Sequence, residues 1–349
     1  MGASYGRMKT ERDQGFVRPF DPFQDLEPVV ELIGIAFGDR LDPTGKATLA
    51  RMRRFAKAGP LLQWLWAFLG RAAVAPGLVW IEDRRVVGNV SLRRARSYEG
   101  YLIGNVVVHP DWRGRGIATA LMETAIRKVS ERGARWIGLE VRADNEAARS
   151  LYAGLAFREV GRTVHLLRPA GRPWGGDPSG GYPPSTATVR RGKSRDGDAL
   201  VELMRAVIQE EHRPLLEVQE SDYQPSWGRT LELWLRGVRE VWWVAEEDEE
   251  LRGAVRVARK AGRFPNRLEI LAKSPRGGIE VALVKHGLAS LNGSPQKPVE
   301  ASLALPADRA VAALKNEGFQ EMHVLVQMKR RLGHRIPVTF KGKKKTGPL

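Results

Sequence analysis

The spacing of apolar residues in the first half of the chain predicts alternating strands and helices. Ile117, Leu121, Ala125 and Val129 recur at helical spacing, so we expect an amphipathic helix over residues 117–132. Further helices are expected in segments 21–37, 46–71 and 146–155. Apolar or β-branched runs predict strands at 16–20, 79–82, 86–94, 101–108 and 136–141. The pattern indicates an α/β (α+β) fold, with a mixed, mostly antiparallel twisted sheet flanked by helices.

The same pattern returns in the second half of the chain. The charged hairpin segment VWIEDRRVVGNVSLRR at 79–94 is echoed by WWVAEEDEELRGAVRVAR at 242–259. Segment 115–126 aligns with 277–288, a shift of 162 residues. Because this shift continues without a gap over about forty residues, it indicates a duplicated domain.

A linker separates the two copies. Residues 169–184 (PAGRPWGGDPSGGYPP) contain five prolines and five glycines, a density that no helix or central strand tolerates. The predicted order is a flexible N-terminus (1–15), a first domain (16–168), a Pro/Gly linker (169–185), a second domain (186–335) and a basic tail (336–349).

The stretch VVVHPDWRGRGIATAL, residues 106–121, passes from a strand through a glycine-rich turn into a helix. The first amides of a helix have no partner within it, and the helix dipole adds attraction for an anion. Gly114 and Gly116 carry no Cβ, so their amides can approach a bound group closely. The turn therefore predicts a site for a phosphate-bearing ligand.

Three features in order carry a family resemblance. Residues 113–118 (RGRGIA) match the R/Q-x-x-G-x-G/A loop of the GNAT superfamily of N-acetyltransferases. Asn145 and Tyr152 follow at family spacing, and a Gly-x-x-Phe closes the motif. Segment 139–157 (LEVRADNEAARSLYAGLAF) is especially similar to the enzymes that acetylate ribosomal-protein N-termini. The chain thus resembles a tandem GNAT protein, closely in its first domain and as a worn copy in its second.

This resemblance implies acetyl-CoA as cosubstrate, with its pantetheine arm and thioester against residues 106–108. It implies direct attack by a primary amine in a ternary complex, and Tyr152 as the acid for the departing thiolate. Glu140 is the only carboxylate in the strand 136–141, and apolar surroundings would raise its pKa toward that of a useful general base. The residues predicted to bind the cofactor are Val106, Val107, Val108, Arg113, Gly114, Arg115, Gly116, Ile117, Ala118, Thr119 and Asn145.

The candidate catalytic residues also have structural interpretations. Tyr152 could serve only in core packing, and Asn145 could only cap the helix that it starts. Glu140 could be a strand carboxylate paired with Arg142 or Arg149.

The glycine loop itself could be a plain strand-to-helix connection. The Arg113 side chain could either contact a phosphate or be exposed to solvent. His109 and His165 are expected to have structural roles.

The second copy lacks the candidate catalytic residues. The 162-residue shift places Ser302 at Glu140, Ala307 at Asn145, Leu314 at Tyr152, Glu280 at Ala118 and Pro275 at Arg113. A carboxylate at Glu280 would repel a phosphate at the start of its helix. We expect a non-catalytic second domain that completes the acceptor site or stands in for the second subunit of a dimer.

Composition adds limits. The chain has no cysteine, which excludes disulfides and thiolate metal sites and fits a reducing cytoplasm; no metal site is predicted. The net charge of +17 attracts polyanions, but neither a zinc spacing nor an RNA-binding aromatic signature accompanies it. The apolar stretch 58–81 is interrupted by Pro60, Arg71 and Pro76, so we expect a buried helix and strand and no membrane contact.

The acceptor stays open at this point. A peptide N-terminus, a lysine or a small-molecule amine all fit, and residues 38–77 should form much of the acceptor wall. The alternative function is a non-catalytic acyl-CoA-binding or sensor protein, or a basic factor that contacts the ribosome or nucleic acid. The tandem arrangement is expected as a pseudo-dimeric monomer or as a homodimer.

Overall fold

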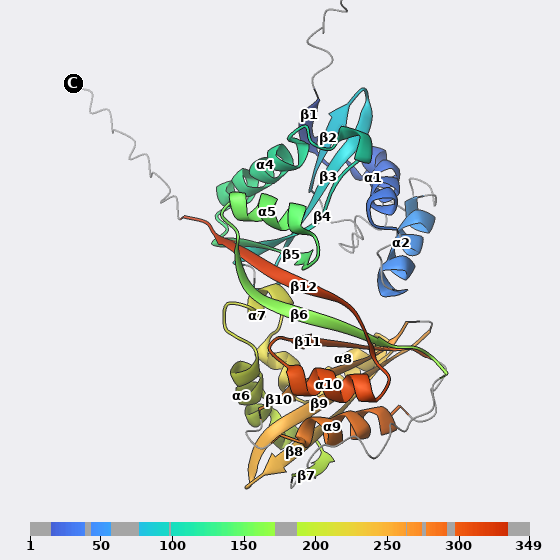
Figure 1. Cartoon of the computed structure of the whole chain (residues 1–349), viewed down its shortest axis with the longest axis vertical. Helices are drawn as coiled ribbons and strands as arrows, with labels where there is room; N and C mark the ends of the chain where they lie inside the picture. The colour runs from blue at the N-terminus through green and yellow to red at the C-terminus, as the bar shows by residue number, and fades with distance from the viewer. Residues whose placement is uncertain are drawn as a thin grey trace, which may run out of the picture.

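The computed structural model describes residues 15–38, 43–56, 77–97, 99–171, 187–262, 264–273, 277–291 and 297–333. Its two halves lie one above the other in Figure 1, and one sheet runs through both. The predicted N-terminal segment up to residue 14, most of the linker and the basic tail fall outside the described residues.

The first half follows the predicted order. Its elements are β1 (Phe16–Pro19), α1 (Pro22–Phe37), α2 (Pro43–Ala56), β2 (Gly77–Glu82), β3 (Arg85–Arg94), β4 (Gly100–Val108), η3 (Pro110–Trp112), α4 (Ile117–Glu131), β5 (Trp136–Arg142), α5 (Glu146–Gly154) and β6 (Arg158–Arg168). The strands and helices predicted over 79–155 are confirmed within one or two residues at most ends.

The second half repeats this order. Its elements are β7 (Thr188–Arg191), η4 (Ser194–Asp196), α6 (Gly197–Val207), α7 (Arg213–Leu216), η5 (Glu220–Tyr223), α8 (Trp227–Leu235), β8 (Val238–Glu247), β9 (Glu250–Lys260), β10 (Asn266–Ala272), α9 (Ile279–Ala289), β11 (Val299–Ala304), α10 (Asp308–Asn316) and β12 (Gln320–Arg331). The helix pairs α4/α9 and α5/α10 and the strand pair β6/β12 each begin 162 residues apart, as the repeat predicts.

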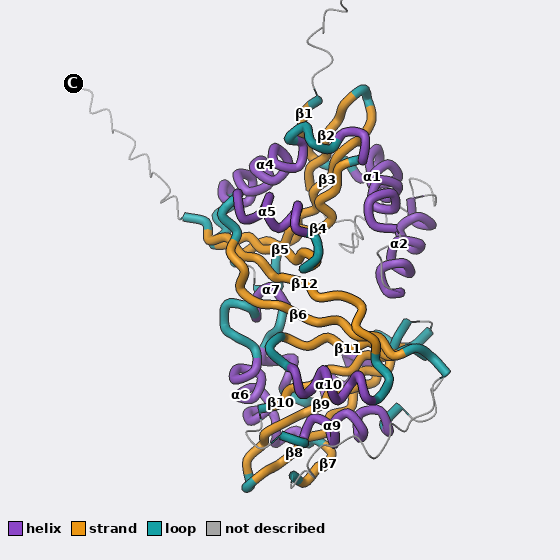
Figure 2. The backbone as a smooth tube through the Cα atoms, viewed as in Figure 1, coloured by secondary structure: helices purple, strands orange, loops and turns teal. Residues whose placement is uncertain are grey.

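The two halves exchange their last strands. The sheet order is β1-β2-β3-β4-β5-β12-β6-β11-β10-β9-β8-β7. Strand β12 of the second half pairs with β5 of the first, while β6 of the first half pairs with β11 of the second. Figure 2 shows β12, β6 and β11 side by side where the halves meet. The sequence boundary at 168 therefore does not separate two independent sheets.

Helices cover both faces of this sheet. Helices α4 and α5 pack on one face of the first half, around Leu121, Ile137 and Leu139. The corresponding core of the second half contains residues of α9 and α10, such as Leu283 and Leu314. Helix α1 lies on the opposite face of the first half, and α6 packs there in the second half. The predicted mixed sheet with flanking helices is confirmed.

The apolar stretch 58–81 is described only from Gly77, where β2 begins as predicted. The expected helix before it lies outside the described residues. None of the described helices is both long and apolar enough to span a bilayer.

Candidate active site

The glycine turn between β4 and α4 has the geometry of an anion site. Gly114 and Gly116 adopt left-handed φ values of 76° and 78°, which L side chains adopt only with strain. A Cβ at either position would meet no other atom within 4 Å, so the space beside the turn is open. The sequence predicts glycine here because a bound group must approach the backbone amides closely. The structure adds a second reason, since both positions have a left-handed φ.

The start of α4 offers unused donors. The Ala120 amide makes the first helical hydrogen bond, to the Gly116 carbonyl at 3.0 Å. In the described chain, none of the amides from Gly114 to Thr119 donates to another protein group. A diphosphate supplies the acceptors that such a row of amides lacks, so the residues present fit the phosphate end of coenzyme A.

The two arginines of the turn differ in their contacts. Arg113 Nε donates to the Val108 carbonyl at 3.1 Å and so ties the turn back to β4. Arg115 pairs with Glu82 at 3.2 Å and donates to the Asp111 carbonyl. Through these contacts both side chains stabilise the turn.

Strand β4 leaves β5 beside the turn. The two strands pair in parallel only from Gly100 to Ile103, and the last pair joins Ile103 to Leu139. A bulge follows at Asn105, whose φ of 49° is left-handed. The Asn89 side chain fixes this bulge by donating to the Asn105 carbonyl at 2.9 Å. The two strands therefore diverge beside the glycine turn.

The bulge also changes which side chains face α4. Ile103 belongs to the core under α4 before the bulge, and Val106 and Val108 pack against that core after it. Val107 instead packs against α1 on the other face. The three valines thus line β4 from both faces along its unpaired edge.

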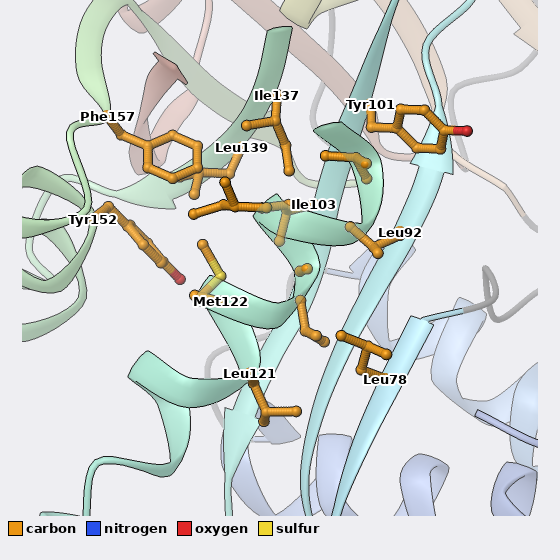
Figure 3. Close-up of a cluster of buried hydrophobic side chains, with 14 of the residues drawn as sticks. Leu78, Leu92, Tyr101, Ile103, Leu121, Met122, Ile137, Leu139, Tyr152 and Phe157 are labelled. Atoms are coloured by element: carbon orange, nitrogen blue, oxygen red, sulfur yellow. The ribbon is translucent and has the colours of Figure 1, made fainter. Parts of the chain in front are cut away.

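Tyr152 lies in the core between α5, α4 and β5. Its side chain is 6% exposed, and its ring lies 6.1 Å from that of Phe157. Figure 3 shows its hydroxyl directed toward Met122 of α4. That hydroxyl makes no hydrogen bond within the described residues, and burial raises its pKa to about 12. Tyr152 is therefore protonated at neutral pH and has a proton to donate.

Glu140 is the first β5 residue beyond the part paired with β4, and it lies on the face opposite α4. Its side chain is open to a cleft yet closely surrounded by protein, and burial raises its pKa. Gln327 of β12 donates to Glu140 Oε1 at 3.0 Å. Neither arginine proposed as a partner pairs with it: Arg142 pairs with Asp144, and Arg149 lies near Glu159.

A buried histidine contacts the other end of the Gln327 amide. His212, from the segment before α7, places Nε2 2.9 Å from Gln327 Oε1. Burial lowers the pKa of His212, so its neutral ring donates Nε2–H while the Gln327 amide donates to the carboxylate. Gly161 of β6 leaves room for the ring, because a Cβ there would collide with it. The second half thus contributes two residues to the surroundings of Glu140, which the sequence did not indicate.

Asn145 caps α5, as its structural interpretation predicts: its side-chain oxygen accepts from the Ala148 amide at 3.2 Å. His109 also acts locally, accepting from the Asp111 amide at 3.4 Å. His165 lines the cleft between the two halves, a location that the sequence did not indicate.

In the second copy, two glycines also precede the helix, and a buried carboxylate follows them. Gly277 and Gly278 have the left-handed φ values of the first turn, and Gly278 precedes α9. Glu280 in the first turn of α9 is only 5% exposed, so a buried carboxylate occupies the helix start. Leu314, at the position of Tyr152, is fully buried in the core. These features support the expectation of a non-catalytic half.

The cleft below Glu140 has a volume of about 460 Å³ and is lined by residues of both halves. A larger cavity of about 600 Å³ lies at the C-terminal end of α4 and contains none of the predicted site residues. Among the described residues, no group of three or more His, Asp or Glu is placed to hold a metal ion.

Comparison with known proteins agrees with this geometry. Residues 48–157 match the acetyltransferase (GNAT) family. An acetyltransferase of Sodalis glossinidius is 50% identical over 87 residues, 24% of this chain and 58% of that protein. The [ribosomal protein bS18]-alanine N-acetyltransferase of Escherichia coli K12 is 44% identical over 56 residues, 16% of this chain and 38% of that one. The chain therefore spans between 38% and 58% of the length of these relatives.

A solved structure extends the likeness in fold to both halves. A tandem GNAT protein from the clavulanic acid biosynthesis pathway covers 92% of this chain and 99% of its own, with a TM-score of 0.54 and 17% identity. The turn, the diverging strands and the repeated order of elements agree with these matches. The first half therefore carries an acetyltransferase (GNAT) domain, and both halves together are similar in fold to a tandem GNAT protein.

Proposed function

We propose that this protein is an N-acetyltransferase that moves acetyl from acetyl-CoA to a primary amine by direct attack in a ternary complex. The observation that carries the proposal is the end of β4–β5 pairing at Ile103–Leu139. The unpaired edge of β4 leads to the glycine turn on one side, and Glu140 follows on β5 at the other.

Acetyl-CoA, when bound, supplies an activated acetyl group as a thioester. The amides from Gly114 to Thr119 would hold its diphosphate, and the edge of β4 at Val106–Val108 would orient its pantetheine arm. Backbone amides on this unpaired edge also offer donors to polarise the thioester carbonyl. The Arg113 and Arg115 side chains would reach the phosphates only by leaving their present contacts.

Glu140 would accept the proton that the amine loses on attack, directly or through a water. An α-amine titrates near 8 and a lysine near 10.4 in model peptides, so attack at neutral pH needs a base. The raised pKa of Glu140 brings it closer to the working pH of such a base. Its location opposite α4 separates the acceptor side of the sheet from the cofactor side.

Tyr152 would return a proton to the departing thiolate. Its hydroxyl, on the α4 side of β5, is protonated at neutral pH because burial raises its pKa to about 12. Proton uptake by Glu140 and proton release by Tyr152 would thus take place on opposite sides of β5, with the thioester between them where β4 and β5 are no longer paired.

The names of the relatives support a proposal about the class of acceptor. Proteins named as a ribosomal-protein alanine N-acetyltransferase and an N-alpha-acetyltransferase match 56 and 83 residues of this chain, which favours a peptide N-terminus over a lysine or a small amine. Domain limits at 168 and 186 and a cytoplasmic location stay predictions from the sequence.

A screen of amines and peptides with acetyl-CoA tests the function. Transfer requires that free thiol and acetylated product, followed by mass, appear in equal amounts, and Glu140→Gln should lower the rate at which both appear by about 10²–10⁴-fold. Binding of acetyl-CoA without product for any amine would leave the sensor function instead. Retention on RNA at about 0.15 M salt, without transfer, would favour the nucleic-acid alternative.

A further inference from the structure

The cleft between the halves is a groove rather than an isolated pocket. Its 460 Å³ hollow is continued by a second hollow of about 220 Å³ along the same face of the sheet. His165, Ser302 and Arg267 line both hollows, so the two form one depression. Its floor consists of the exchanged strands β12 and β6 and their neighbours β5, β11 and β10.

The register of these strands fixes the direction of the groove. At one end, Glu140 pairs with Gln327, which in turn pairs with Gly161. Toward the other end, Ser302 pairs with His165. Four strand intervals of about 4.8 Å separate β5 from β10, so the two ends lie about 19 Å or more apart. An acceptor that touches both ends must be long.

The charged side chains differ between the two ends of the groove. Three of its carboxylates besides Glu140 are held by arginines in the pairs Glu217–Arg93, Asp222–Arg96 and Glu269–Arg256. A fourth arginine of the lining, Arg229, also pairs with Asp222. Arg267, whose side chain is exposed to the groove, has no ion pair or hydrogen bond within the described residues. Glu300 of β11 lies opposite Arg267 in the strand register, and Lys260 lines the same hollow. The base candidate thus lies at one end, and two cations with one carboxylate lie at the other.

A buried hydroxyl points to a ligand between these ends. Thr163 of β6 lines the groove, is only 5% exposed, and its Oγ1 has no hydrogen-bond partner in the described structure. A buried polar atom is costly to leave unpaired, so an acceptor that bonds it removes a cost already present in the free protein.

We propose that this groove binds the acceptor as an extended peptide, with its amino-terminal nitrogen at Glu140, a backbone group at Thr163 and an acidic side chain at Arg267. An extended chain advances about 3.3 Å per residue, so a span of about 19 Å places the acidic residue near position six or seven. The proposal rests on the proposed function, because it assumes that Glu140 faces the reacting amine. It assigns the non-catalytic half the role of selecting the acceptor.

Matched peptides test the charge selection. Octapeptides of neutral residues with a single glutamate at each position from two to seven are compared with their glutamine counterparts. We expect kcat/KM to favour glutamate about tenfold at position six or seven. Arg267→Gln should remove this preference while leaving the KM for acetyl-CoA unchanged. Arg239→Gln, an exposed arginine of the same half outside the groove, is the matched control and should keep the preference.

Thr163→Val separates ligand binding from folding. Because the hydroxyl is unpaired in the free protein, the valine variant should unfold at the same or a higher temperature and yet show a several-fold lower kcat/KM for the preferred peptide. A lower unfolding temperature would mean that the hydroxyl serves the fold, and would overturn its assignment to the acceptor.

The outcomes distinguish this proposal from the function on which it rests. If no amine of any kind is acetylated, the transferase function itself fails. If peptides are acetylated without regard to charge, or if a small amine is the better substrate, the transferase stands and the acidic-peptide proposal is overturned. The same follows if Arg267→Gln lowers the rate for glutamate and glutamine peptides equally.

Discussion

Replacing Gln327 with leucine removes the hydrogen bond that its amide donates to Glu140 across the junction of the two halves. The bond is 3.0 Å long and ends on a carboxylate whose pKa is already raised by burial. A hydrogen bond to a charged group contributes about 1.5–3 kcal/mol, and 1.36 kcal/mol corresponds to one pKa unit. Because Glu140 is open to water in the cleft, solvent replaces part of the lost bond. We therefore expect the pKa of Glu140 to rise by about one unit.

The sign of the effect on activity follows from the role of a base. Glu140 works when ionised, so a higher pKa moves the acid limb of the kcat/KM profile to higher pH by about one unit. Well above that limb, the variant and the parent should reach similar rates. The assay is the acetylation rate of one amine as a function of pH, from the acid limb to the plateau above it.

Two controls test whether Gln327→Leu acts through the pKa of Glu140. The variant also leaves the Nε2–H of buried His212 without its acceptor, which costs about 1–3 kcal/mol of stability, so thermal unfolding is measured alongside. Glu140→Gln should remove the acid limb altogether. The reasoning is refuted if Gln327→Leu lowers the rate equally at every pH, because a lost fold contact would do that without shifting a pKa.

Three further expectations concern other parts of the structure. Tyr152→Phe should lower kcat by about 10²–10⁴-fold with little change in acetyl-CoA affinity, measured by steady-state kinetics and calorimetry; an unchanged kcat would exclude the tyrosine as the acid. Gly116→Ala, at a φ of 78°, should cost about 1–2 kcal/mol and weaken acetyl-CoA binding about tenfold by calorimetry, whereas Gly154→Ala in α5 should bind normally; equal affinities would contradict the amide site. Cleavage of the chain within residues 172–186 should leave the halves associated on size exclusion, since β6 and β12 each pair across the junction; separation into two folded halves would contradict this.

The second half contributes structure to the first, which is a physical reason for it to persist. Its strand β12 supplies Gln327 beside Glu140. Arg168, buried at the end of β6, donates to the Glu317 carbonyl at 2.7 Å and ties the exchanged strand to the second half. Removing this half would expose an edge of β5 and remove most of the residues that line the groove.

Local signals in the sequence determined the elements and the cofactor side of the site. The helical period over 117–132, the glycine pair at 114 and 116 and the spacing from Glu140 to Tyr152 each depend on residues near one another in the chain. Steric and capping preferences act over that range, so the turn, α4 and β5 follow from the sequence. The repeat at 162 residues likewise gave the order of the second half.

Only the tertiary structure decided which strands meet. The hydrophobic pattern of β6 or β12 specifies a buried face but no neighbour, because every central strand offers the same backbone donors and acceptors. The exchange of these two strands brings Gln327 and His212 to Glu140, residues 187 and 72 positions away from it, and places Arg267 on the same groove. The turn proposed to bind the cofactor is thus a property of one segment of the chain, whereas the proposed acceptor groove depends on pairing between segments far apart in sequence.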